Sequence, residues 1–127
     1  YTRVSGAYSM PKSPPEEKTA RRTAIQDALK IAMGTPMNVF RACAEVLGTL
    51  DELAGLGNPN LISDVGVAAA LVLGALDGAQ LNVEINLAFL KDEALVASTR
   101  AALEQIGPPA RDAARKTLDK VYGRVRE

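Results

Sequence analysis

The sequence contains no histidine, and Cys43 is the single cysteine among its 127 residues. Without imidazole the chain lacks the usual general base, so hydrolases of the Ser-His-Asp type and histidine metal sites are excluded. A single cysteine forms no internal disulfide, and no signal-peptide pattern is present, so we expect a cytoplasmic protein. Any catalysis must use carboxylates, amines, hydroxyls or amides.

Aromatic residues and net charge are also scarce: the chain has 3 Tyr, 2 Phe and no Trp, and 15 basic residues balance 15 acidic ones. Such a chain offers neither a basic surface for phosphates nor a stacking platform for bases, so we expect no nucleic-acid partner. Asp64 and a turn at 57–60 interrupt the longest uncharged run, which predicts no membrane span. Residues 1–127 are of the size expected for one domain with a core.

Apolar residues recur at helical spacing, and no segment alternates like a strand. Capping and breaking signals predict five helices in an all-α array, over about 14–33, 36–56, 63–90, 92–107 and 109–125. Gly34 and Gly107-Pro108 are the expected stops, and the first twelve residues are expected to be loosely structured. On the second helix the predicted buried stripe is Val39, Cys43, Val46, Leu50 and Leu53, with Phe40 and Leu47 beside it.

The third predicted helix is the most informative. Ser63 is placed to cap it, and Asp64 lies near the positive end of its dipole. From Val65 to Leu76 it is apolar all round and rich in Gly and Ala. This pattern predicts a buried central helix, enclosed by neighbours that approach its backbone closely.

Three polar positions on this helix are candidate functional residues. Asp64 begins a helix that otherwise avoids charge, and either a catalytic role or a simple first-turn acid explains it. Asn82 and Asn86 lie four residues apart on one face, and buried amides require partners. A ligand ring, a neighbouring subunit or backbone carbonyls at helix ends would each supply them.

Asp64 and Asn82 are separated by eighteen residues, or about five helical turns, so they project from the same side about 27 Å apart. They cannot flank one small reacting centre within a single subunit. A two-fold dimer with antiparallel central helices would bring them together.

Other polar residues have simpler explanations available. Lys12 precedes the first long helix and would suit an anionic ligand, or be a solvated charge. The basic last helix carries Asp112 and Asp119 among its cations, which predicts a salt-bridged surface rather than a membrane or calmodulin site. Cys43 falls in an apolar stripe and is expected in the core.

Several motifs carry a resemblance to a known family. They are Gly57-Asn58-Pro59-Asn60, Ser63-Asp64-x-Gly66-Val67, the pair Asn82 and Asn86, and Tyr8-Ser9-Met10-Pro11-Lys12, which is similar to a Tyr-x-Leu-Pro-Lys segment. Taken together, in their order along the chain, these motifs resemble the cyclodeaminase/cyclohydrolase family. That family includes methenyltetrahydrofolate cyclohydrolase and the cyclodeaminase half of formiminotransferase-cyclodeaminase. The similarity extends over about residues 7–90.

The resemblance implies a helical homodimer that hydrolyses 5,10-methenyltetrahydrofolate to 10-formyltetrahydrofolate without a cofactor. Formiminotetrahydrofolate cyclodeaminase activity, with release of ammonia, is the alternative within the family. Asp64 is then the expected catalytic acid, and the expected substrate contacts are Lys12, Asn60, Ser63, Asn82 and Asn86.

The family pattern also includes a glycine-rich N-terminal segment and two further helices, for which this sequence has no counterpart. We therefore expect the chain to be a fragment of a longer enzyme. The alternative is a catalytically silent domain that binds folate or dimerises.

Overall fold

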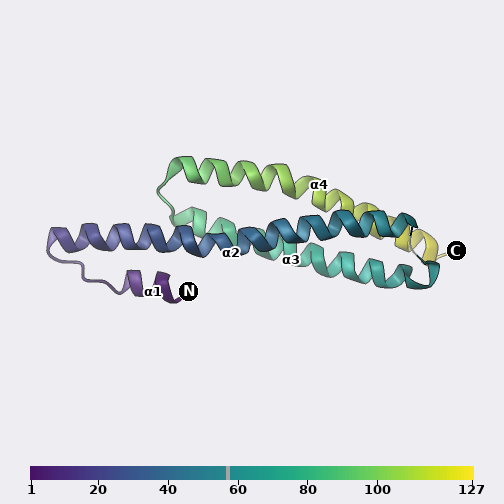
Figure 1. Cartoon of the computed structure of the whole chain (residues 1–127), viewed down its shortest axis with the longest axis horizontal. Coiled ribbons are helices and arrows are strands. Elements are labelled where there is room, and N and C mark those ends of the chain that lie inside the picture. Colours follow the sequence, from purple (N-terminus) through teal and green to yellow (C-terminus); the bar gives the residue numbers. More distant parts are fainter. Residues whose placement is uncertain (57) are drawn as a thin grey trace.

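The computed structural model describes residues 1–56 and 58–127. Within them the chain forms α1 (Thr2–Tyr8), α2 (Pro15–Leu56), a 3₁₀ turn at Pro59–Leu61, α3 (Ile62–Phe89) and α4 (Glu93–Val125). The three long helices run up, down and up beside one another, and α1 lies along the beginning of α2 (Figure 1). The all-α prediction is confirmed.

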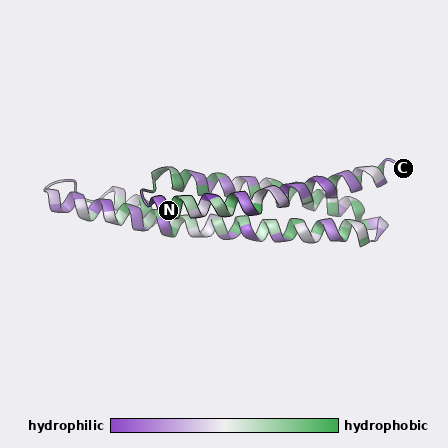
Figure 2. Cartoon of the chain, turned by 90° about the horizontal axis from the view of Figure 1, so that it is seen from above, coloured by the Kyte–Doolittle hydropathy of each residue, from purple (hydrophilic) through white to green (hydrophobic). Residues whose placement is uncertain are grey.

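The core of the bundle follows a seven-residue repeat. On α2 the buried positions include Met33, Phe40, Leu47 and Ala54, and on α3 they include Ile62, Ala69, Leu76 and Val83. A repeat of seven corresponds to 3.5 residues per turn, which keeps two helices in contact when they coil gently around each other. Figure 2 shows apolar and polar residues interleaved along every long helix.

The structure corrects the number of helices, because α2 continues through Gly34 and Pro36 without a break. Proline removes the N–H that would reach the Ala32 carbonyl, and a proline inside a helix costs about 3 kcal/mol. Met33 and Phe40 flank this point and both are buried in the core. Burial of two such side chains contributes about 1.5–3 kcal/mol each, which offsets the cost and keeps the helix continuous.

The predicted stop at Gly107 is wrong for a related reason. Gly107 is buried inside α4, and a Cβ there would lie 2.5 Å from Arg111 Nη1 and 3.4 Å from Phe40 Cζ. The nearest atom belongs to the flexible end of Arg111 on α4 itself, so an added Cβ would displace that side chain, while Phe40 of α2 lies at ordinary van der Waals distance. The prolines that follow are exposed, so the carbonyls they leave without a helical donor face water.

The N-terminal residues are ordered, contrary to expectation. Thr2–Tyr8 forms α1, which buries Ala7 against the core. Arg21 on α2 holds the end of α1, because its Nε and Nη2 donate to the Tyr8 carbonyl over 3.3 and 3.1 Å. The Arg21 guanidinium also lies 5.6 Å from the centre of the Tyr8 ring.

Helix α3 is not enclosed on every side, which corrects the second part of the prediction for it. It buries one face, whereas Leu71 is 71% exposed and Val67, Ile85 and Phe89 are also exposed. The helix is continuous through Asp64, and Pro59–Phe89 is long and apolar enough, by length and composition, to cross a membrane. The core helices of soluble proteins often meet the same criterion, so this feature alone does not decide the environment.

Candidate functional site

A groove of about 1110 Å³ lies between α1, α2 and α3. Its walls are mainly apolar. They include Val4 and Tyr8 of α1, Ile31, Pro36 and Val39 of α2, and Ala75, Ile85 and Phe89 of α3. The volume is close to that of known small-molecule sites, which are typically lined by apolar groups with a few polar ones.

Asn82 and Asn86 both line this groove. The Asn86 side chain donates from Nδ2 to the Asn82 main-chain oxygen over 2.8 Å, so a backbone carbonyl within the helix is one partner of the pair. The Asn82 side-chain amide makes no hydrogen bond within the described part of the chain. Two amides on one wall can therefore orient a ring that carries its own donors and acceptors.

Two anchors fix the walls of the groove. Arg21 holds α1 through the Tyr8 carbonyl, as described above. On the opposite wall, Gln26 donates from Nε2 to the Phe89 carbonyl and accepts from the Lys91 main-chain N–H. The last turn of α3, which carries Asn86 and Phe89, is thus tied directly to α2.

The other predicted site residues on α3 lie at its opposite end. Asn60, Ser63 and Asp64 are all exposed near the start of the helix. The N-cap position is Leu61, with no side-chain hydrogen bond, so the prediction that Ser63 caps the helix is wrong. Local capping is supplied earlier, where Asn58 Oδ1 accepts from the Asn60 N–H over 3.0 Å.

A single chain does not assemble the whole predicted site. Asp64 is about 27 Å from Asn82 along a continuous α-helix and does not line the groove. Lys12 is exposed in the link between α1 and α2, and it does not line the groove either. No cluster of three metal-binding side chains occurs in the described residues.

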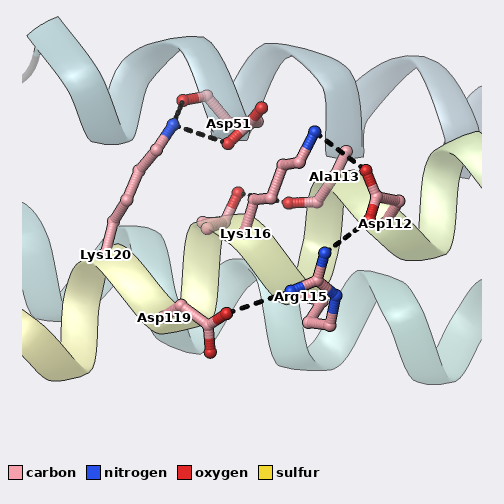
Figure 3. A network of polar contacts seen from close by, with 8 residues as sticks. Asp51, Asp112, Ala113, Arg115, Lys116, Asp119 and Lys120 are labelled. Carbon is pink, nitrogen blue, oxygen red and sulfur yellow. Dashed lines mark hydrogen bonds and ion pairs between the residues drawn. The ribbon is translucent and has the colours of Figure 1, made fainter.

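Several cations of α4 have acidic partners, as the sequence predicts. Arg115 contacts both Asp112 and Asp119, and Lys116 contacts Asp112 at 2.9 Å (Figure 3). Lys120 reaches across to Asp51 of α2 at 2.8 Å. Hydrogen bonds from Lys116 and then Arg115 lower the pKa of Asp112 below its usual value. This surface is therefore a salt-bridged network.

Sequence reasoning missed part of the groove. Tyr8 and Phe89 form opposite walls, together with Thr35 and Pro36 at the middle of α2. Their signal in the sequence is weak, because α1 and α3 both pack on α2 and only this packing brings the residues to one groove. Cys43 is half-buried against the core cluster, as expected.

Comparison with known proteins agrees with this architecture. The family model of formiminotransferase-cyclodeaminase matches residues 1–105. A methenyltetrahydrofolate cyclohydrolase from Methylorubrum extorquens is 43% identical over 101 residues, which cover 80% of this chain and 49% of the relative. The formimidoyltransferase-cyclodeaminase of Rattus norvegicus is 32% identical over 94% of this chain and 22% of its own length.

A solved structure, the formiminotetrahydrofolate cyclodeaminase of Thermotoga maritima, superimposes with a TM-score of 0.83 at 30% identity. The match covers 98% of this chain and 58% of that one. The chain thus spans about half the length of the cyclohydrolase and of the solved structure. From the family match and these relatives, the chain belongs to the formiminotransferase-cyclodeaminase family.

Proposed function

We propose that this chain carries out, or contributes to, the hydrolysis of 5,10-methenyltetrahydrofolate to 10-formyltetrahydrofolate. The observation that carries the proposal is the groove lined by Asn82 and Asn86 in a chain 43% identical to a methenyltetrahydrofolate cyclohydrolase. The amides are suited to the polar edge of a pterin ring, and the apolar walls to its faces. Lys12 would meet the carboxylates of the glutamate tail.

The reaction requires little beyond a carboxylate. Water attacks the cationic methenyl carbon between N5 and N10, and its proton passes to a base as the C–O bond forms. The C–N5 bond then breaks, N5 takes up a proton, and the formyl group remains on N10. A carboxylate stabilises the cationic substrate and accepts the proton from water, and we assign this role to Asp64.

Two other functions remain open. The first is formiminotetrahydrofolate cyclodeaminase activity, which is favoured by the solved structure that matches nearly the whole chain. The second is a silent domain that binds folate or dimerises, because Asp64 lies far from the groove within one chain. The reaction products distinguish the three functions. A cyclohydrolase forms 10-formyltetrahydrofolate, a cyclodeaminase releases ammonia, and a silent domain does neither.

The remaining parts of the proposal follow from composition and family. We expect a cytoplasmic homodimer with folate as its small-molecule partner, without a metal or other cofactor. Neither nucleic acid nor a membrane is expected as a partner.

The decisive experiment follows the absorbance of methenyltetrahydrofolate with the chain, an Asp64→Asn variant and a Glu52→Gln control. Both carboxylates are exposed, so neither change should disturb the fold. We expect decay above the buffer rate, a loss of about 100-fold or more in Asp64→Asn, and no loss in the control. Ammonia release from the formimino substrate without methenyl hydrolysis would establish the deaminase instead. Folate binding without either product would indicate a silent domain.

A further inference from the structure

The α2 wall of the groove contains a proline inside a helix. Pro36 lies in the interior of α2, and Ala32, Thr35 and Pro36 all line the groove. Residues four apart in a helix share one face, so Ala32 lies one turn before Pro36 on the groove side. The middle of α2 therefore faces the same space as Asn82 and Asn86 of α3.

The proline changes what the main chain offers to this groove. An alanine at position 36 would donate its N–H to the Ala32 carbonyl, whereas proline has no N–H to donate. The Ala32 carbonyl thus lacks its usual helical donor and can accept a hydrogen bond from another molecule. Pro108 and Pro109 release carbonyls of α4 in the same way, but they do so at exposed positions outside this groove.

Packing within the chain does not explain why this residue is proline. Pro36 is half-buried and α2 continues through it, so it neither ends the helix nor fills the centre of the core. Alanine would keep the helix continuous at a lower cost, because proline is the least favourable residue in a helix interior. A role of the released carbonyl in the groove accounts for the proline.

Thr35 adds a second polar group beside this carbonyl. Its side chain is exposed and lines the groove. Thr19, Thr49 and Thr117 each donate from the hydroxyl to the carbonyl four residues earlier. The Thr35 hydroxyl makes no such bond to any residue of 1–56 or 58–127, so it can donate to a ligand and accept from it.

The polar side chains around the groove are neutral. Among the residues that line it, the polar side chains belong to asparagine, serine, threonine and tyrosine, and none is a carboxylate, an ammonium or a guanidinium. A charged ligand group taken out of water requires a charged partner, which these walls do not provide. A neutral flat ring with donors and acceptors on its edges fits the groove better than a phosphate or a carboxylate.

We propose that the Ala32 carbonyl, released by Pro36, accepts a hydrogen bond from an N–H group of the pterin ring, and that the Thr35 hydroxyl binds beside it. The ring then spans the groove between this carbonyl on α2 and the amides of Asn82 and Asn86 on α3. Pro36 is thus a specificity-determining residue, because it favours a ring that carries an N–H donor at this point. The assignment rests on the proposed function, which supplies the ring.

Two substitutions at position 36 separate the carbonyl from the ring surface of the proline. Pro36→Ala and Pro36→Val both restore the N–H, but only valine keeps a bulk close to that of proline. Calorimetry with pteroic acid, which carries the pterin ring without the glutamate tail, measures ring binding by the full chain. We expect both variants to unfold at higher urea than the wild type and to bind pteroic acid at least about 5-fold more weakly. Weaker binding by the alanine variant alone would assign the effect to the proline ring and overturn the proposal.

Pro108→Ala is the matched control, because it restores a helical donor at an exposed point of α4 outside the groove. It should also raise the urea midpoint, but it should bind pteroic acid like the wild type. An equal loss of binding in this control would show that a stiffer bundle is the cause, and it would overturn the proposal. Thr35→Val keeps the shape of the side chain and should weaken binding about 2–5-fold. Unchanged binding there would reject the part assigned to the hydroxyl.

The outcomes also separate this inference from the proposed function. Hydrolysis of methenyltetrahydrofolate, with KM and pteroic acid affinity unchanged in both Pro36 variants, would retain the function and reject the inference. Binding of pteroic acid that weakens in both variants, without hydrolysis by the wild type, would do the reverse. A wild-type chain that does not bind pteroic acid would also reject the inference.

Discussion

Gln26 donates a hydrogen bond to the main-chain carbonyl of Phe89 over 3.1 Å, from a position sixty-three residues earlier in the chain. Its Oε1 accepts from the Lys91 N–H over 2.8 Å, so one side chain satisfies two backbone groups at the end of α3. One turn further along α2, Lys30 pairs with Asp92, which caps α4. The beginning of α2 therefore fixes both helices at the turn next to the groove.

Replacement of Gln26 by alanine should lower the free energy of unfolding by about 1–2 kcal/mol, because two backbone groups lose their partner. Gln26→Glu should cost less, since its carboxylate still accepts from Lys91 although it no longer donates to Phe89. Urea titration measures both. Gln105→Ala, exposed on α4, should change stability by less than about 0.5 kcal/mol. Equal stability of wild type and Gln26→Ala would show that water replaces both bonds.

Asp92 should make the bundle sensitive to acid. The hydrogen bond from the Leu95 N–H, and then that from Lys30, lower the pKa of Asp92 below its usual value in the folded chain. The unfolded carboxyl therefore takes up its proton first, so this stabilisation is present at neutral pH and is lost as the pH falls from about 5 through the lowered pKa. Asp92→Asn keeps an oxygen for capping but cannot titrate. Its urea midpoint should depend less on pH than that of the wild type below pH 5, and parallel curves would contradict this assignment.

Gly66→Ala tests the contact between α3 and α4. A Cβ at Gly66 would lie 2.7 Å from Cγ1 of Val121, a short branched side chain that cannot move away easily. We expect a loss of about 1–3 kcal/mol from overpacking. Val121→Ala in the same chain should recover part of it, which a double-mutant cycle measures. Gly48→Ala, where a Cβ meets nothing, is the matched control and should gain up to about 1 kcal/mol.

The sequence predicts the helical class, the turn at 58–60 and the start of a helix at Asp92, because each depends on residues close together in the chain. Gly57, the first residue of the predicted turn, lies outside the described residues. It wrongly predicts stops at Gly34 and Gly107, since the local cost of these glycines and of the nearby prolines is outweighed by packing against helices far away in sequence. Rules based on neighbouring residues do not include the energy of these distant contacts. The order of α1 was missed for the same reason, because a seven-residue helix is stable only through contacts with α2.

The buried stripe of α2 shows a further limit. Periodicity predicts Val39, Val46 and Leu53 as core, yet these are the exposed members, while Phe40 and Leu47 are fully buried. Both sets are apolar, so the arc of α2 is wider than one contact requires. A wide apolar arc predicts contact with two neighbouring helices. Periodicity alone does not specify which of the two sets of residues packs against a helix of the same chain. The candidate site is divided in the same way, with Asn82 placed in the groove and Asp64 left outside it.

The last prediction concerns the short wall of the groove. Helix α1 buries only Ala7, so its position depends strongly on the contacts of Arg21 with the Tyr8 carbonyl and ring. Arg21→Gln should leave the long helices intact, and hydrogen exchange of the α1 amides should become at least about 10-fold faster, because a loss of 1.4 kcal/mol from the local opening free energy has that effect. Arg22→Gln, at the exposed neighbour, is the matched control and should exchange like the wild type. Unchanged protection of α1 in Arg21→Gln would show that apolar packing alone holds this helix and that the arginine serves another purpose.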